Sequence, residues 1–455
     1  MQISSSKWWV LIAVGVSTFM SALDSSVVNI ILPILHRDLN TSVAVIEWVV
    51  IIYLLVVGGL LLTFGRLGDL HGHRRIFLSG FIIFILSSAA CGLAQSDAQL
   101  ILFRGIQAVG AAMLAANSPA ILTSSFPPHQ RGQALGLQGT MTYLGLTVGP
   151  TLGGLLATRF TWRAVFYINV PVGLLALLLS FLFVPRDGGH TSDERFDLPG
   201  AALFIAGLTA FLLALNQGGT WGWASPPILG LLLAAVLLLG FFLRLELRVP
   251  APMLDLSLFR SPVFSVSTLS AVLNYICVYG ILFLMPFYLI QGRVMTPEQA
   301  GFVLSAQPLV MAVLAPISGS ISDRIGTRLP ASAGMLFLAV GLFLLSRLNG
   351  TSPVTQVALA LAVAGLGIGL FVSPNNSALM GAAPANRQGI ASGILATARS
   401  VGMVLGLGFA GAIFTTVLTG REPAAAPWLF QGVRAGLLGS LVVAVLGTIL
   451  AAFRD

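Results

Sequence analysis

The sequence predicts an all-α membrane protein in which two six-helix bundles are accompanied by two inserted transmembrane helices, fourteen helices in total. Three observations predict it: the composition, the spacing of the apolar stretches and an internal repeat. Of the 455 residues, 56% are hydrophobic and only 8% are charged, and the mean hydropathy is +0.95. Because soluble domains carry about 25% charged residues, this composition excludes a soluble globular protein.

Apolar stretches long enough to cross a bilayer recur along the whole chain. A membrane-spanning helix needs about 20 predominantly apolar residues. The stretch that begins at Trp8 is much longer than a signal-peptide core, so we expect it to remain as a membrane helix. The fourteen predicted spans are residues 8–35, 43–64, 76–95, 98–125, 132–157, 163–184, 198–217, 226–247, 263–290, 298–320, 330–347, 354–380, 388–418 and 433–453.

Lysine and arginine residues are distributed unequally between the two sides of these spans. Fourteen fall on one side and seven on the other. Because cytoplasmic loops carry the excess of positive charge, both termini are expected in the cytoplasm, and the protein is expected in the cytoplasmic (inner) membrane of a bacterium. The net charge of +8 comes from scattered residues that form no patch with aromatic side chains. No nucleic-acid partner is therefore expected.

An internal repeat organises the chain. The segment GRLGD at residues 65–69 recurs as GSISD at 319–323, and Ser-Pro at 118–119 recurs at 373–374. Two parallel copies of a six-helix unit, with a binding site between them, are typical of transporters. The predicted domains are residues 1–184, a linker with two extra helices at 185–262, and residues 263–455. We interpret the extra helix pair, which has almost no polar residues within the membrane, as a lipid-facing spacer without chemistry of its own.

Three charged residues lie deep within the predicted spans: Asp24, Arg104 and Arg399. An ionisable residue in hydrocarbon costs roughly 2.5 to 3.5 kcal/mol, so it indicates a function. Burial favours the neutral acid and a nearby guanidinium favours the carboxylate, so Asp24 and Arg104 are the predicted proton-coupling pair. The alternatives are a structural ion pair for Asp24 and backbone carbonyl partners for Arg104. Arg399 either binds an anionic group or fixes the second half of the chain.

Four motifs follow one another at the predicted helices: Asp24 with Asn29, residues 65–75, residues 104–110 and residues 145–154. In this order they resemble the fourteen-helix branch of the major facilitator drug:proton antiporters, over essentially the whole chain. Leu70 and His73 stand where that family usually has basic residues. The resemblance implies the major facilitator fold and a proton-coupled exporter that works by alternating access.

The fourth motif places glycines at a spacing of four, on one face of a helix, where a neighbouring helix can approach closely. Ordinary tight packing explains this spacing by itself. The resemblance implies instead a seam that closes one side of the transport path, with the helix around Ala315 as its partner. The motif consists of Gly145, Gly149, Pro150, Gly153 and Gly154.

The loop motif centres on Asp69, with Gly65 and Arg74 in the same segment. A carboxylate at this place can accept backbone N–H groups at the start of another helix. The resemblance implies that it latches the cytoplasmic side closed, whereas the alternative is a topology determinant only. The repeated motif contains Asp323 and Arg324.

Polar and aromatic residues in several predicted spans are candidates for binding an amphipathic, aromatic cargo. The alternative is that most of these side chains face lipid or other helices. The candidates are Asn29, Asn274, Tyr275, Tyr279, Gln307, Asn375, Asn376 and Arg399.

Three classes of function remain open at this point. The first is a proton-coupled exporter of lipophilic or amphipathic drugs. The second is a lipid or glycolipid flippase of the same fold, with Arg104 and Arg399 available to an anionic head group. The third, a sensor or membrane enzyme, would need a soluble domain or a catalytic grouping, and the sequence has neither. We expect no enzyme activity, no cofactor and no metal, and a monomer whose partners are a small-molecule substrate, protons and membrane lipid.

Overall fold

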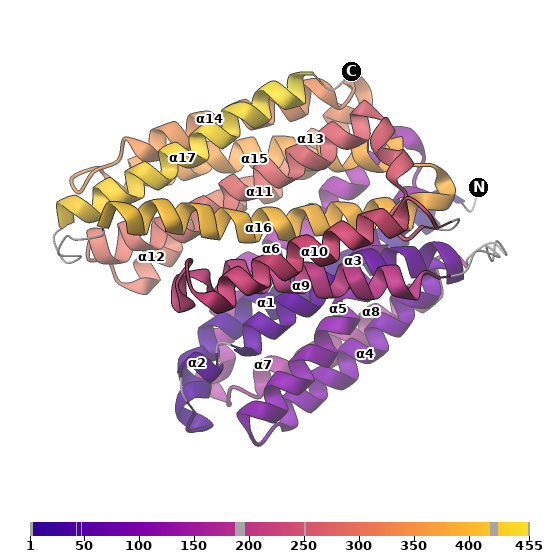
Figure 1. Cartoon of the computed structure of the whole chain (residues 1–455), viewed down its shortest axis with the longest axis horizontal. Coiled ribbons are helices and arrows are strands. Elements are labelled where there is room, and N and C mark those ends of the chain that lie inside the picture. The colour runs from indigo at the N-terminus through magenta and orange to yellow at the C-terminus, as the bar shows by residue number, and fades with distance from the viewer. Residues whose placement is uncertain are drawn as a thin grey trace. The chain divides into compact units, whose positions relative to one another are not determined.

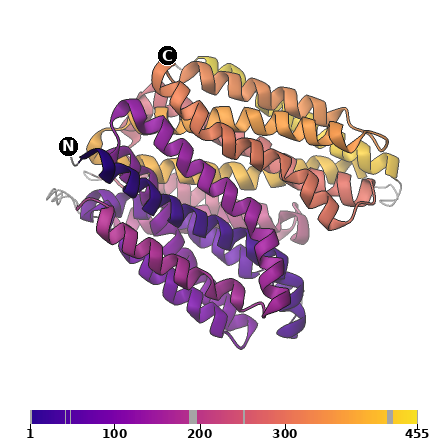
Figure 2. The same ribbon diagram turned by 180° about the vertical axis from the view of Figure 1, so that it is seen from behind.

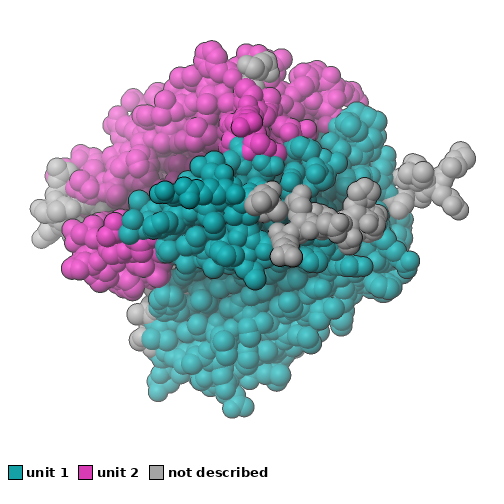
Figure 3. Space-filling model, turned by 45° about the vertical axis from the view of Figure 1, so that its right-hand side comes forward, with its two compact units in different colours: residues 1–209, 236–256, 383–397 teal, residues 210–235, 257–382, 398–455 magenta. Residues whose placement is uncertain are grey.

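Helices account for nearly all of the structure, a computed structural model that describes residues 3–41, 43–46, 48–186, 196–249, 252–418 and 426–453 (Figure 1). The view from behind shows the same long helices (Figure 2), and no strand occurs within the described ranges. The chain divides into two compact units, coloured separately in Figure 3. Unit 1 comprises residues 1–209, 236–256 and 383–397, and unit 2 comprises residues 210–235, 257–382 and 398–455. The domain boundaries predicted from the sequence stay a prediction.

Unit 1 is built around two pairs of packed helices, α1 with α6 and α4 with α5, while α3 also packs on α5. Its second and third segments bring in the end of α10 and the start of α16. The elements are α1 (Ile3–Asp38), α2 (Val43–Ile46), α3 (Trp48–His71), α4 (His73–Leu93), α5 (Asp97–Ser125), η1 (Pro128–Gln130), α6 (Arg131–Arg159), α7 (Ala164–Tyr167), α8 (Asn169–Phe183), the first half of α9 (Leu198–Trp221), the second half of α10 (Pro226–Glu246), η4 (Ala385–Arg387) and the start of α16 (Gln388–Leu418).

Unit 2 has α15 at its centre, packed against both α13 and α14, and α17 packs on α11 and α14. After Pro286, α11 continues as a π-helical segment, η3. The elements are η2 (Leu256–Arg260), α11 (Pro262–Pro286), η3 (Phe287–Gly292), α12 (Pro297–Leu304), α13 (Ala306–Ile325), α14 (Arg328–Ser346), α15 (Val354–Ala382), the remainder of α16, α17 (Ala426–Ala452) and the adjoining parts of α9 and α10.

Thirteen helices in the described ranges are long and apolar enough to cross a membrane. The fourteenth predicted span, residues 132–157, forms the 29-residue helix α6 but is not among these thirteen. This helix is rich in glycine, threonine and glutamine, which make it less apolar than its neighbours. Thirteen apolar spans are therefore shown, and a membrane crossing by α6 stays a prediction.

A proline divides the predicted span 163–184 into α7 and α8. Pro171 has no N–H to donate to the carbonyl of Tyr167, so the helical ladder is interrupted at Ile168. The next backbone bond, from Val172 N to Ile168 O, is long at 3.5 Å. As a result α8 begins at Asn169, whose side chain lies in the interior of unit 1.

Candidate functional site

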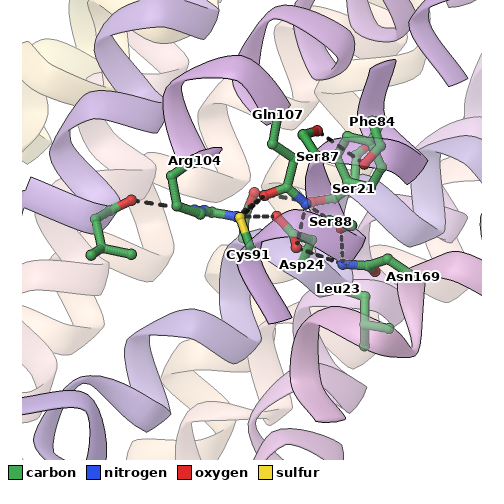
Figure 4. A network of polar contacts seen from close by, with 12 residues as sticks. Ser21, Leu23, Asp24, Phe84, Ser87, Ser88, Cys91, Arg104, Gln107 and Asn169 are labelled. Atoms are coloured by element: carbon green, nitrogen blue, oxygen red, sulfur yellow. Dashed lines mark hydrogen bonds and ion pairs between the residues drawn. The ribbon is translucent and has the colours of Figure 1, made fainter. Parts of the chain in front are cut away.

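A buried ion pair joins α1 and α5 in the interior of unit 1 (Figure 4). Nη1 of Arg104 donates to Oδ2 of Asp24 at 2.7 Å, and both side chains are about 1% exposed. The guanidinium also donates from Nε to the Val49 carbonyl at 3.3 Å, and its Cζ lies 4.2 Å from the centre of the Tyr53 ring. One positive and one negative charge thus share an interior site, so each compensates the charge that burial would otherwise leave unpaired.

Three neutral polar side chains complete the network around this pair. Oδ1 of Asp24 accepts from Asn169 Nδ2 at 2.7 Å and from Gln107 Nε2 at 3.1 Å. Ser88 Oγ accepts from both amides, at 2.5 Å from Gln107 and 3.1 Å from Asn169. Gln107 Oε1 in turn accepts from Arg104 Nη1 at 2.6 Å. Three donors, from Arg104, Gln107 and Asn169, therefore point at one carboxyl group, and its two oxygens accept all of them.

The position of each member of the network follows from local structure. Helix α5 starts where the Ser96 hydroxyl accepts the N–H of Gln99, an N-cap that leaves Arg104 about two turns inside the helix. Gln107 follows by three residues, so it lies on the same face as Arg104. The α7–α8 break described above sets Asn169 against Asp24.

The sequence singled out the two charges of this network, and the structure brings them into contact. Ser88 and the amide of Asn169 were missed. Neutral polar side chains are common in membrane helices. Unlike a charged residue, a serine or an asparagine in a predicted span therefore does not by itself indicate a functional site. Gln107 lies within the predicted motif at residues 104–110, and its spacing of three from Arg104 is the signal that assigns it to the network.

A second contact lies where α3 ends and α16 begins, both within unit 1. Asp69 Oδ1 accepts from the backbone N of Gly389 at 2.7 Å, and Oδ2 accepts from the backbone N of Ile390 at 2.9 Å. The first N–H groups of a helix have no partner inside the helix and carry its positive dipole end. The start of α16 is therefore an anion-binding site, and the anion that it binds is the Asp69 carboxylate of the same chain.

Glycines allow the two backbones to meet at this contact. A Cβ on Gly65 would collide with the Gly389 carbonyl oxygen, and a Cβ on Gly389 would collide with the Gly65 carbonyl oxygen and lie 2.8 Å from Asp69 Oδ1. One turn later, a Cβ on Gly393 would lie 2.9 Å from the Leu62 Cα. The start of α16 therefore crosses α3 at a distance that only glycine permits.

His73, which stands where the family usually has a basic residue, extends the contact. Asn117 donates from Nδ2 to the carbonyls of Phe64 and Met113, so its Oδ1 is the atom that faces His73 Nδ1, at 2.8 Å. Nδ1 must then carry the hydrogen. Nε2 faces Asp69 Oδ1 at 3.4 Å, and an attractive contact there requires a second proton on the ring. His73 thus lies between the Asn117 amide and the Asp69 carboxylate.

Other members of the loop motif and its repeat have different neighbours. Arg74 donates to the Phe181 carbonyl at the end of α8 at 2.7 Å, and its Cζ lies 5.3 Å from the Phe181 ring centre. Of the repeated motif, Asp323 is half-buried and Arg324 is exposed near the end of α13.

The glycine face of α6 packs against α1. A Cβ on Gly145 would lie 2.7 Å from the Phe19 carbonyl, one on Gly149 would collide with Ser26 Oγ, and one on Gly153 would lie 2.7 Å from Val27 Cγ1. A Cβ on Gly154 would meet nothing within 4 Å, and the side chain of Pro150 lies outside the described residues. The expected partner, the helix around Ala315, is corrected to α1. The small surface at Ala315 instead packs on α15, where Ser373 Oγ donates to the Ala315 carbonyl at 2.9 Å.

Three of the cargo candidates lie together in unit 2. The Cζ of Arg399 lies 5.2 Å from the centre of the Tyr275 ring, and Tyr279 is close enough to interact electrostatically with both. Tyr279 and Arg399 are half-buried, and Tyr275 is buried. A guanidinium over a tyrosine ring beside a second phenol offers both a cation and aromatic surface.

The remaining candidates have separate environments. Asn274 Nδ2 contacts Met335 Sδ at 3.5 Å, whereas Asn375 Nδ2 donates to the Ser267 carbonyl at 3.0 Å. Gln307 is buried and Asn376 is half-buried. The side chain of Asn29 lies outside the described residues.

The fold, with thirteen described helices long and apolar enough to cross a membrane, is that of an integral membrane protein. Residues 14–407 and 267–455 match the Major Facilitator Superfamily, and the chain belongs to it. The riboflavin transporter RibZ of Clostridioides difficile is 36% identical over 413 residues, which cover 91% of this chain and 89% of that protein. The multidrug resistance protein Stp of Mycobacterium tuberculosis is 35% identical over 410 residues, 90% of this chain and 76% of Stp.

Solved structures agree with the fold. The human organic anion transporter MFSD10 superimposes with a TM-score of 0.70, covering 98% of this chain and 99% of that one. Because its sequence is only 18% identical, this likeness concerns the fold alone.

Proposed function

We propose that the chain is a proton-coupled antiporter that exports lipophilic or amphipathic molecules across a bacterial cytoplasmic membrane. It does so through fourteen membrane helices with both termini in the cytoplasm, as in the drug:proton branch. Charge distribution along the sequence supports the orientation. Relatives named for multidrug resistance and riboflavin transport support the class of cargo.

The observation that carries the proposal is the carboxyl group of Asp24, buried with Arg104 as its charged partner. A proton on Asp24 removes the negative charge and leaves the guanidinium of Arg104 without compensation. Removing one partner of a buried pair typically costs about 3 to 5 kcal/mol. Protonation therefore disfavours this arrangement of unit 1 and favours one in which water or cargo reaches Arg104.

Asp69 supplies the second part of the mechanism. Its hold on the first N–H groups of α16 stabilises one arrangement of α3 and α16, and alternating access requires that this hold be released once per cycle. A proton taken up at Asp24 and a latch opened at Asp69 are then two steps of one exchange cycle.

The energy available from protons is sufficient for export. One elementary charge crossing 100 mV provides about 2.3 kcal/mol, which supports roughly a 50-fold gradient of a neutral cargo. The group formed by Tyr275, Tyr279 and Arg399 supports a cargo with an aromatic system and a neutral or anionic part.

The test is transport by purified protein in liposomes with an imposed pH gradient. Riboflavin and a panel of lipophilic antibiotics serve as cargo, and a pH-sensitive dye follows proton movement. The wild type is expected to exchange protons for at least one cargo. The Asp24→Asn protein is expected to bind that cargo without exchange. Asp38→Asn is the matched control, because Asp38 lies exposed at the end of the same helix.

Undiminished proton exchange in Asp24→Asn would contradict the proposal. The lipid flippase alternative loses one of its two head-group candidates, because Arg104 is bound to Asp24. The flippase alternative predicts that labelled lipid moves between the leaflets and that no cargo of the panel causes proton movement. Both quantities can be measured in the same liposomes.

A further inference from the structure

Two buried carboxyl groups that take part in neither of the contacts described above lie at the ends of the inserted helices. Asp197 precedes the first residue of α9, and Glu246 is the last residue of α10. Their side chains are 8% and 4% exposed. The sequence predicts no chemistry for this helix pair, and neither acid stands out in it.

Each acid has one oxygen that is bound and one that is not. Asp197 Oδ1 accepts from the Gly200 backbone N at 3.0 Å, and Glu246 Oε2 accepts from the Leu254 backbone N at 3.0 Å. Asp197 Oδ2 and Glu246 Oε1 are buried and have no hydrogen-bond partner within the described part of the chain.

The two unbound oxygens face a common point. A Cβ built on Gly200 would touch Asp197 Oδ2 and lie 2.9 Å from Glu246 Oε1. The oxygens are thus within about 5 Å of each other, close enough that two carboxylates cannot both ionise without strong repulsion.

Among the described residues, the charges around the pair do not balance. The charged groups that act on Glu246 within this part of the chain are Asp197 and Arg66, a residue of α3 that is 1% exposed. Two carboxylates opposite one guanidinium leave one buried negative charge uncompensated, which is costly. A single proton restores neutrality and lets one carboxyl group act as a donor.

We propose that Asp197 and Glu246 form a second proton-binding site, which holds one proton between their unbound oxygens beside Arg66. Its position connects it to α3. A Cβ on Gly59 of α3 would lie 3.3 Å from Thr209 Oγ1 of α9, and Thr63 Oγ1 lies 4.0 Å from Met253 Sδ. Helix α9 and the segment after α10 therefore contact the helix that carries Asp69. Large apolar side chains of α10 such as Leu233 and Phe241 are exposed, so the interpretation of the pair as a lipid-facing spacer stays a prediction.

Infrared spectroscopy tests the site directly, because a protonated carboxyl group has a C=O stretch that shifts in deuterium oxide. The purified full chain is titrated between about pH 5 and about pH 9, a range that covers documented buried carboxyl groups. All measurements use an Asp24→Asn background, which removes the signal of Asp24. This background is expected to show one deuterium-sensitive band that disappears as the pH rises.

Adding either Glu246→Gln or Asp197→Asn is expected to abolish this band, because the acid that remains is balanced by Arg66 and ionises. Adding Asp38→Asn, at an exposed acid, is expected to leave it unchanged. The proposal is overturned if the Asp24→Asn protein has no such band, or if the band survives in both added variants. The absence of the band is measured on the Asp24→Asn protein alone, so this outcome does not depend on whether the double variants fold.

Thermal unfolding provides an independent measurement. A proton held by the folded pair and lost on unfolding stabilises the protein at low pH, so the unfolding midpoint should fall as the pH rises. This slope is expected to flatten in Glu246→Gln compared with Asp38→Asn, and equal slopes would contradict the proposal. Neither measurement uses a cargo, so the outcome is independent of the transport experiment.

Discussion

The carboxylate of Asp69 binds the backbone N–H of Gly389, a residue 320 positions further along the chain. Together with Ile390, this contact places a negative charge on the positive end of α16. Its strength depends on the charge of Asp69, on the absence of side chains at the crossing and on His73. Each of these can be varied separately.

Asp69→Asn keeps one acceptor oxygen but removes the charge. Hydrogen bonds to charged groups contribute about 1.5 to 3 kcal/mol, compared with about 0.5 to 1.5 kcal/mol for neutral ones. Amide exchange at Gly389 and Ile390 should therefore become roughly tenfold faster, as measured by hydrogen–deuterium exchange. Asp323→Asn changes the corresponding acid of unit 2 and should leave these amides unaffected.

Gly389→Ala places a methyl group where the Gly65 carbonyl and Asp69 Oδ1 already lie. Overpacking of this kind costs typically about 1 to 3 kcal/mol, so the unfolding midpoint should fall and exchange at Ile390 should rise. Gly381→Ala is the matched control, because a Cβ there meets nothing within 4 Å. A stable Gly389→Ala protein with unchanged exchange would show that the close crossing does not hold α16.

His73 should make the contact depend on pH. Protonation adds a positive charge next to Asp69, so protection of the Gly389 amide, corrected for intrinsic exchange, should be higher at about pH 6 than at about pH 8. His73→Gln should remove this difference, and His73→Arg should keep protection high at both values. A difference that persists in His73→Gln would assign it to another group.

Arg104→Met leaves the Asp24 carboxylate buried without its cation. A loss of about 3 to 5 kcal/mol in unfolding free energy is expected, as for other broken buried pairs. The double variant Asp24→Asn/Arg104→Met removes both charges and should be more stable than Arg104→Met alone. Denaturant unfolding in detergent measures both, and additive effects would argue against a direct interaction.

Long helices could be predicted closely from the sequence. The predicted spans 98–125 and 388–418 correspond to α5 (Asp97–Ser125) and α16 (Gln388–Leu418), because apolar runs of this length have one stable form in a membrane. The break before Asn169 was missed, although Pro171 marks it. The span 163–184 is predicted from the average hydropathy of its residues, and this average does not change when one backbone hydrogen bond is missing.

The charged centre of the candidate site could be predicted as well, since Asp24 and Arg104 are conspicuous in hydrocarbon. Partners that depend on tertiary packing could not be predicted. The spacing of Gly145, Gly149 and Gly153 fixes one face of α6, yet nothing in it distinguishes α1 from any other neighbour. Asp197 and Glu246 were overlooked because each lies at a span end, where an acid usually meets water.

The separation of Asp69 from its partner also has a consequence during biosynthesis. A ribosome adds about 5 to 20 residues per second, so roughly 15 to 60 seconds pass between the synthesis of Asp69 and that of Gly389. Throughout this interval the Asp69 carboxylate has no α16 N–H groups to accept from. The cell's insertion machinery therefore handles a half-finished protein in which the end of α3 is not yet joined to α16, and only the synthesis of α16 completes this contact.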